Sequence, residues 1–204
     1  MDRTVCFRDF EERDIDFIYK CKNDENLNSM IVGDYHPFTY DEASKWVRGC
    51  IGQHDTYKFW AICTNDDEKR IVGWVSLSNI DIHNKSACHH GIVIGEKEYK
   101  SGISMFEAML FTMAYSFEYL QLHRLYGSCF SNHKVSPFML ESLGFKLEGI
   151  EKEAVIRGGD YFDVSNYAIL SEQYFKNKAE GNYDIENLIV KFISLVNNKK
   201  IKRK

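Results

Sequence analysis

The segment between residues 94 and 103, with the sequence GEKEYKSG, could bind an anion. It joins an apolar run to the beginning of the longest helical pattern in the chain. A helix N-terminus carries free backbone amides and a partial positive charge, and glycine lets a phosphate approach the backbone. The segment adds a cation, a hydroxyl and one small residue, namely Lys100, Ser101 and Gly102, and Ser104 in the first helical turn adds a second hydroxyl. These residues predict a phosphate site, with an ordinary strand-to-helix connection as the alternative.

Two adjacent histidines, His89 and His90, form a second group that could do chemistry. A neutral imidazole with an ordinary pKa of about 6.5 can accept a proton near neutral pH. Both histidines lie in an apolar run typical of a strand, and neighbours on a strand face opposite sides. At most one of them therefore faces any one site. The alternative is that one is packed in the core and the other is a packed polar residue.

These groups need a sheet to position them. Alternating or continuous apolar runs predict seven strands, at 4–10, 56–64, 70–80, 86–95, 122–130, 146–155 and 161–170. The polar sequences NDDEK and DIHNK link the second, third and fourth strands, which suggests a meander.

Between most of these strands, apolar residues are spaced as in a helix. One helix is expected within 11–22, and a capping box at Thr39 and Glu42 predicts a second. That helix should turn Ala43, Trp46, Val47 and Ile51 inward. A long helix of about 18 residues is expected to begin at Gly102, because apolar residues then recur at intervals of three and four residues. A short helix around Pro137 should end at Gly144.

This order of elements predicts an α+β fold, a mixed central sheet with helices on both faces. The long helix is a crossover, so the strands at 86–95 and 122–130 should be parallel. Near the end, 185–196 is strongly apolar and helical in pattern. We expect this extra C-terminal helix to pack on the body, although pairing with a second copy of the chain stays open. The last six residues, KKIKRK, are expected to be a disordered basic end.

Composition narrows the class of protein. The chain has 204 residues and a net charge of −4, and five basic residues lie at its end. The body is therefore acidic, which disfavours nucleic acid as a partner. Six cysteines show no C-x-x-C or zinc-finger spacing, so we expect reduced thiols and no metal. A charged start and the lack of a long apolar run predict a cytoplasmic protein without a membrane span.

Several longer motifs resemble one superfamily. They are the strand GIVIG with its EYKSG loop, the helix end SFEYLQLHRLY, the block NHKVSPFMLESLGFKLEG, and RGGDYFDVSNYAIL near residues 157–170. Over about residues 6–174 the chain resembles the Gcn5-related N-acetyltransferase (GNAT) superfamily. It is most similar to the branch that holds the ribosomal-protein N-terminal acetyltransferases. The resemblance implies an acetyltransferase domain at 1–175, followed by the C-terminal helix and basic end at 176–204.

The resemblance also implies acetyl-CoA as co-substrate. Its pantetheine arm would lie along Val93, Ile94 and Gly95, and Asn132 would contact the arm, with His133 as the alternative by counting back from Gly144. Its diphosphate would lie on the loop and helix start formed by Lys100, Ser101, Gly102, Ile103, Ser104 and Met105. Counting back from residues 107 and 108 puts Ile103 and Met105 where the family has small residues. A shift by one puts Gly102 and Ser104 there, and we prefer that register because it avoids a clash.

The same resemblance implies catalytic and substrate residues. Leu140 stands where many members have an acidic tyrosine, and Ser136 matches a serine assigned that role in the ribosomal-protein branch. Ser136 could instead cap the short helix. His89 falls where branch members often carry glutamate, so it is the preferred base. On the acceptor side we expect Asp163 and His36, while Asp163 could instead close a turn.

The predicted function is therefore an acetyl-CoA-dependent N-acetyltransferase. The acceptor is expected to be a protein N-terminal amine or a small-molecule amine, by direct attack in a ternary complex. One alternative is a nucleotide-linked amino sugar, and polyamines and antibiotic amines also stay open as small-molecule acceptors. The other is a non-catalytic GNAT-fold binding module, since the phosphate loop departs from the family pattern. Acetyl-CoA and the amine are the expected partners, and a homodimer stays open.

Overall fold

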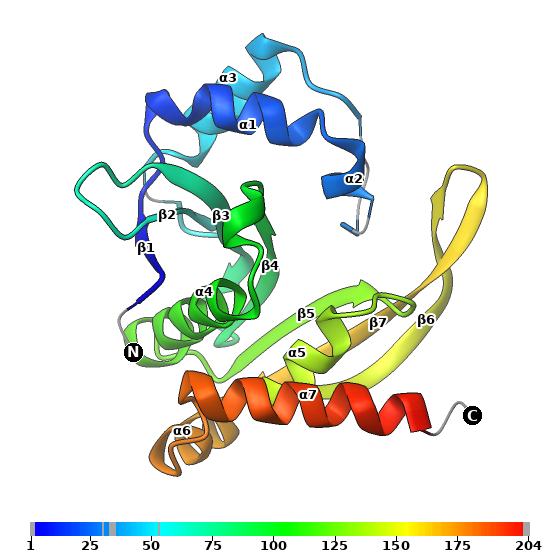
Figure 1. Ribbon diagram of the computed structural model, residues 1–204. Helices are drawn as coiled ribbons and strands as arrows, with labels where there is room; N and C mark the ends of the chain where they lie inside the picture. The colour runs from blue at the N-terminus through cyan, green and yellow to red at the C-terminus, as the bar shows by residue number, and fades with distance from the viewer. Residues whose placement is uncertain (1–2, 30, 33–35, 53, 202–204) are drawn as a thin grey trace.

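A computed structural model describes residues 3–29, 31–32, 36–52 and 54–201 of the chain. Its centre is a seven-stranded sheet with the order β1-β2-β3-β4-β5-β7-β6 (Figure 1). The strands are β1 (Val5–Arg8), β2 (Lys58–Thr64), β3 (Ile71–Asp81), β4 (Ser86–Ile94), β5 (Arg124–Phe130), β6 (Lys146–Arg157) and β7 (Asp160–Leu170). All seven predicted strands are present, with bounds shifted by a few residues.

The strands pair as the element order predicts. β1 to β4 form an antiparallel meander, and β4 pairs with β5 in parallel. β7 lies between β5 and β6 and is antiparallel to both. The predicted crossover and the mixed α+β fold are confirmed.

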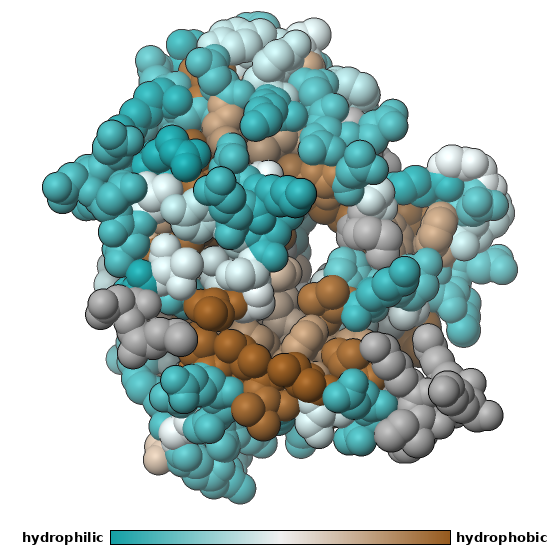
Figure 2. Space-filling view, in the orientation of Figure 1, coloured by the Kyte–Doolittle hydropathy of each residue, from teal (hydrophilic) through white to brown (hydrophobic). Residues whose placement is uncertain are grey.

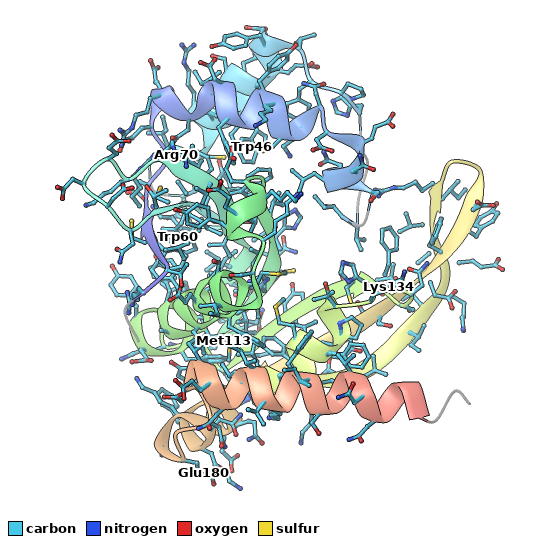
Figure 3. All side chains as sticks on the ribbon, in the orientation of Figure 1. Trp46, Trp60, Arg70, Met113, Lys134 and Glu180 are labelled. Atoms are coloured by element: carbon cyan, nitrogen blue, oxygen red, sulfur yellow. The ribbon has the colours of Figure 1, made fainter. Side chains whose placement is uncertain are left out.

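Helices cover both faces of the sheet (Figure 1). On one face α1 and α3 pack over a core that includes Trp74 and Val93. On the other face α4 packs over a second core with Trp60. Figure 3 shows Trp46 and Trp60 on these two sides of the sheet. The helices are α1 (Ile15–Lys22), α2 (Glu25–Asn28), α3 (Tyr40–Cys50), α4 (Gly102–Ala114), α5 (Ser136–Leu143), α6 (Ser171–Ala179) and α7 (Ile185–Ile201).

Local signals in the sequence explain where the helices begin and end. The Thr39–Glu42 capping box forms as predicted. The expectation for Ile51 was wrong, because α3 ends at Cys50 and an extended backbone at Ile51 leaves its side chain 38% exposed. Cys50 takes the inward position instead, with 4% exposed. Gly144 ends α5 at φ +96, where a side chain would be strained.

The C-terminal helix α7 packs on the body. Leu188 is fully buried, and the Phe192 ring lies edge-on to the rings of Phe106 in α4 and Phe138 in α5. This confirms the expected intramolecular packing. The backbone of α7 continues to Ile201, beyond the predicted end at 196. The rest of the predicted disordered end, residues 202–204, lies outside the described residues.

Candidate functional site

Strands β4 and β5 separate partway along their length. Their parallel pairing covers only residues 86–88 and 124–126, although both strands continue. β4 contains a bulge, since its pairing with β3 shifts beside Ser76 and Gly91 adopts φ +138. A bulge adds a residue and increases local twist, so β4 bends away from β5. Figure 2 shows the molecule hollowed between the part that carries β4 and the part that carries β5 to β7.

Gly127 marks the last close approach of the two strands. A Cβ at this position would lie 3.0 Å from the backbone oxygen of His89. A side chain at this position would therefore be tight against the backbone of β4. The residue types of both strands thus define where the opening begins.

The two histidines of β4 face opposite sides, as strand geometry predicts. His89 is paired with Leu77 and points into the α4 side, where only 8% of it is exposed. Its Nε2 is buried and has no hydrogen-bond partner among the described residues. Burial lowers the pKa of His89 to about 4, so its imidazole is neutral at pH 7. A buried ring nitrogen without a partner can accept a hydrogen bond from a bound molecule, whereas the lowered pKa disfavours its protonation.

His90 lies on the other face and is exposed. Desolvation, followed by the charge of Lys22, lowers the pKa of His90 below its ordinary value. His90 therefore shares its side of the sheet with α1. The opening consequently has one buried and one exposed imidazole on opposite sides of β4.

The loop after β4 is held in place by its backbone and by one glycine. The amides of Gly95 and Glu96 both donate to the carbonyl of Val72, at 2.9 and 3.3 Å. A Cβ on Gly95 would lie 2.5 Å from Sγ of Cys21 and 2.7 Å from the ring of Phe17. Glycine at this position lets α1 pack directly against the end of β4. A single 3₁₀ turn, Lys97–Tyr99, then leads to α4.

The N-terminus of α4 leaves backbone donors free. Ser101 caps the helix, because its Oγ accepts from the amide of Ser104 at 3.2 Å. The amides of Gly102 and Ile103 have no partner within the described part of the chain. A Cβ added at Gly102 would meet open space. Lys100 beside this cap is exposed. Two free amides, an open glycine and a cation form the kind of cradle that holds a phosphate.

The other side chains at the helix start are buried or half-buried. Ser104 is fully buried and its hydroxyl lies 3.1 Å from that of Ser101. Met105 is half-buried and packs against the α4 core, and Ile103 is half-buried. The open position is therefore Gly102, whereas Ser104 is buried and its amide is engaged by Ser101.

At the start of α5 the structure assigns the capping role to a different residue than expected. Nδ1 of His133 accepts from the amides of Val135 and Ser136, at 3.1 and 3.0 Å. Desolvation lowers the pKa of His133, which keeps Nδ1 available as an acceptor. Ser136 is half-buried at the first turn of the helix, and Asn132 just before it is exposed.

The two predicted substrate residues lie on separate elements. Asp163 in β7 accepts from Nζ of Lys152 at 2.8 Å and from the amide of Glu153 at 2.9 Å. The Lys152 contact chiefly lowers the pKa of the Asp163 carboxyl. His36 is exposed, and its ring lies 5.3 Å from that of Phe38. The described contacts do not join either residue to the histidines of β4.

A group that the sequence did not reveal lies beside His90. Nζ of Lys22 lies over three aromatic rings, 4.8 Å from Trp46, 5.2 Å from Phe38 and 5.5 Å from Trp74. Among the described residues it has no hydrogen-bond acceptor or carboxylate partner. Desolvation lowers its pKa. The rings come from α3, β3 and a loop, so no local motif could have indicated this cage.

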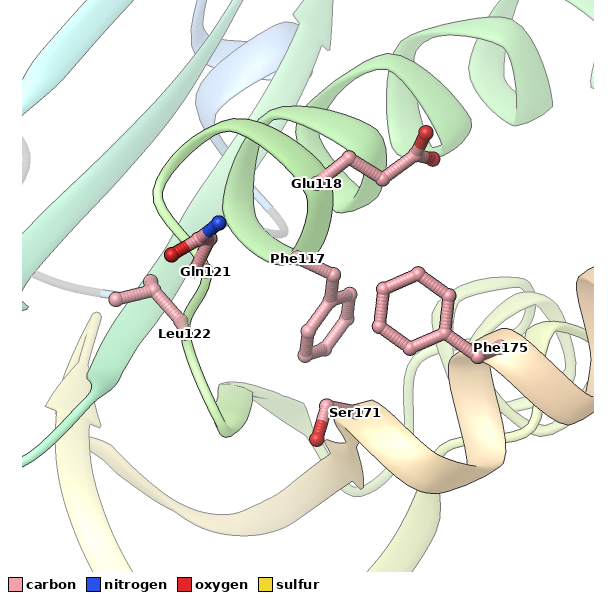
Figure 4. Close-up of a pocket in the computed structure, with 6 residues that line it drawn as sticks. All are labelled: Phe117, Glu118, Gln121, Leu122, Ser171 and Phe175. Carbon is pink, nitrogen blue, oxygen red and sulfur yellow. The ribbon is translucent and has the colours of Figure 1, made fainter.

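Other surfaces lie away from this opening. A shallow pocket at the opposite end of α4 is lined by Phe117, Glu118, Gln121, Leu122, Ser171 and Phe175 (Figure 4). Its one carboxylate, that of Glu118, is engaged by Tyr174 and Lys178. Among the residues that the structure describes, no group of His, Cys, Asp or Glu could hold a metal ion. No described helix is long and apolar enough to cross a membrane.

Comparison with known proteins shows which family has this fold. The family model of the acetyltransferase (GNAT) domain matches residues 4–146, so the chain belongs to the GNAT family. This confirms the expected family. The spermidine N-acetyltransferase of Vibrio cholerae, solved with CoA and spermine, superimposes with a TM-score of 0.74 and 24% identity, covering 84% of this chain and 98% of that one. This structural similarity supports a GNAT fold for the chain.

Curated relatives agree with the family. The chain is 27% identical over 182 residues to the spermidine N(1)-acetyltransferase of Vibrio cholerae, which covers 88% of this chain and all of that protein. It is 33% identical over 97 residues to the ribosomal protein uS5-alanine N-acetyltransferase of Escherichia coli. That alignment covers 48% of this chain and only half of the relative.

Proposed function

We propose that the protein is an N-acetyltransferase that uses acetyl-CoA to acetylate a primary amine. The observation that carries this proposal is the separation of β4 from β5 beside the free amides of Gly102 and Ile103. An elongated thioester carrier with a diphosphate needs both features, a slot between strands and an anion cradle at its end. Family membership supports the same conclusion.

The residues of this chain fit the expected co-substrate. Lys100 and the helix start around Gly102 would hold the diphosphate, and the edge of β4 at 93–95 would lie beside the pantetheine arm. Asn132 is the expected side-chain contact to that arm. Acetyl-CoA supplies an activated acetyl group as a thioester.

In this reaction the protein would bind the amine in its neutral form and provide a base and an acid for the proton transfers. The amine nitrogen attacks the thioester carbonyl carbon, the carbon–sulfur bond breaks, the nitrogen gives one proton to a base, and the thiolate takes one from an acid. Freeing a lysine-type amine at pH 7 costs about 4.6 kcal/mol, whereas an α-amino group costs about 1.1 kcal/mol. A weakly basic acceptor therefore needs little help from a base.

His89 is the base that the sequence favours, and its buried Nε2 lacks a partner, but it points to the α4 side and its lowered pKa makes it a weak base. His90 is a second candidate, since it is exposed on the side of α1. Ser136 is the proposed proton donor to the thiolate. His133 fixes the backbone amide of Ser136, which orients the first turn of α5.

For the acceptor, we favour a protein N-terminal amine. The ammonium of Lys22, beside His90, places positive charge on the α1 side of β4, which opposes a polycationic acceptor. A nucleotide-linked amino sugar is the second candidate, because its diphosphate is anionic. Asp163 and His36 are the proposed acceptor contacts. A cytoplasmic location is a further prediction.

A test needs two measurements on the full chain. Calorimetry with CoA separates an enzyme from a binding module that has lost the carrier, and no heat at millimolar CoA would overturn the proposal. An acceptor screen that follows CoA release should compare an alanine-initiated peptide, an amino-sugar nucleotide and spermidine. We expect the peptide to be acetylated fastest, and preference for spermidine would contradict the electrostatic assignment.

A further inference from the structure

The guanidinium of Arg157 joins two parts of the chain that are distant in sequence. Arg157 is the last residue of β6, at the far end of the β6–β7 hairpin. Its Nη1 donates to the backbone oxygens of Asn28 and Ser29, at 2.9 and 2.7 Å. Its Nη2 donates to the oxygen of Ile31 at 2.7 Å. One side chain thus holds three carbonyls at the end of α2.

These contacts complete a ring around the opening between β4 and β5. On one side, Arg157 lies 5.4 Å over the ring of Phe130, the last residue of β5. On the other side, the Nδ2 of Asn28 donates to the backbone oxygen of Cys21 at 2.8 Å. α1 in turn packs on β4 at Gly95. In Figure 1, α2 and the end of the β6–β7 hairpin flank the same gap.

This ring of contacts lies on the α1 and α2 side of the opening. The acceptor would enter from this side, because the diphosphate would occupy the other. The anion cradle is at the start of α4, which covers the opposite face of the sheet. α1 and α2 lie on the face of His90 and Lys22. An acceptor that reaches the thioester from this side must pass the segment held by Arg157.

We propose that Arg157 is a positioning residue that holds the end of α2 over the opening and thereby sets the affinity for the acceptor amine. This inference rests on the proposed function. A guanidinium suits the task, because its planar fork presents several fixed donors to several acceptors, and charge strengthens each hydrogen bond. Lysine could satisfy only part of this arrangement.

The test uses Arg157→Ala, Arg157→Lys and a matched control, Arg124→Ala. Arg124 also bridges two strands, through a bidentate pair with Glu148, but it lies at the closed end of β5. Hydrogen–deuterium exchange of peptides covering 20–32 measures the contact without activity. Steady-state kinetics with acetyl-CoA and the best acceptor of the panel measure the two KM values separately.

We expect faster exchange at 20–32 in Arg157→Ala and a KM for the acceptor raised about tenfold, equal to about 1.4 kcal/mol. The KM for acetyl-CoA should stay within about twofold of the original, a change below about 0.5 kcal/mol. Arg157→Lys should recover part of the effect, and Arg124→Ala should behave as the unchanged protein.

Unchanged exchange and unchanged KM values in Arg157→Ala would overturn the inference. Equal increases in both KM values would also overturn it, because they would indicate a general loss of structure. If the unchanged protein acetylates no acceptor, the proposed function fails, while the exchange measurement still decides whether Arg157 holds the end of α2.

Discussion

At the residue scale, burial separates the two adjacent histidines of β4. His89 is 8% exposed with its pKa lowered to about 4, and an unfolded chain restores a pKa near 6.5. The unfolded state therefore binds more protons between pH 6.5 and pH 4. It follows that the folded protein loses stability as the pH falls through this range.

We predict that His89→Gln removes this part of the pH dependence. The lost stability should amount to about 3 kcal/mol between pH 6.5 and pH 4 in the unchanged protein, since one pKa unit is about 1.4 kcal/mol. Urea unfolding at several pH values measures it. The same slope in His89→Gln would show that other groups cause the acid sensitivity.

A second prediction concerns catalysis. If His89 accepts the amine proton, His89→Ala should lower kcat/KM at pH 7 by about 10²-fold or more and recover partly at high pH, where the amine is already neutral. His83→Ala is a matched control, because His83 is exposed in the turn between β3 and β4. An unchanged pH–rate profile in His89→Ala would show that His89 is not the base and would leave His90 as the candidate.

At the scale of elements, two glycines of the loop between β4 and α4 should respond oppositely to alanine. Gly95→Ala forces a Cβ to within 2.5 Å of Cys21 Sγ, so we expect a loss of about 1–3 kcal/mol of unfolding free energy. Gly102→Ala enters open space and should change that free energy by no more than about 0.5 kcal/mol. Equal losses in both variants would mean that the close contact at Gly95 does not limit packing.

The elements were also the part of the fold best predicted from sequence. The Thr39 capping box, the period of α4 and Gly144 each act through neighbours a few residues away, so a local pattern is sufficient. The inward position predicted for Ile51 was wrong, because α3 ends at Cys50. The spacing of apolar residues does not determine the last residue of a helix. The cage around Lys22 and the contacts of Arg157 require residues from distant segments, and local patterns do not contain that information.

At the scale of the whole molecule, α7 contributes to the core of the fold. Leu188→Ala should lower the free energy of unfolding by about 2–5 kcal/mol, because its side chain is fully buried between α7 and the body. Val190→Ala, two residues further on and 68% exposed, should change it by no more than about 0.5 kcal/mol. Chemical denaturation of both variants measures the difference. Similar small effects would show that α7 is separable from the domain.

The start of α4 is the proposed binding site for the diphosphate of CoA. Calorimetry should compare CoA with pantetheine, which lacks the diphosphate and the adenosine 3′-phosphate joined to it, for the unchanged protein and for Gly102→Val, the change that isolates the helix start. We predict that the unchanged protein binds CoA at least about 100-fold more tightly than pantetheine, a difference of about 2.7 kcal/mol. Gly102→Val should lose most of that difference while its unfolding free energy stays nearly constant. Equal affinity for the two molecules, or no CoA binding at all, would contradict it.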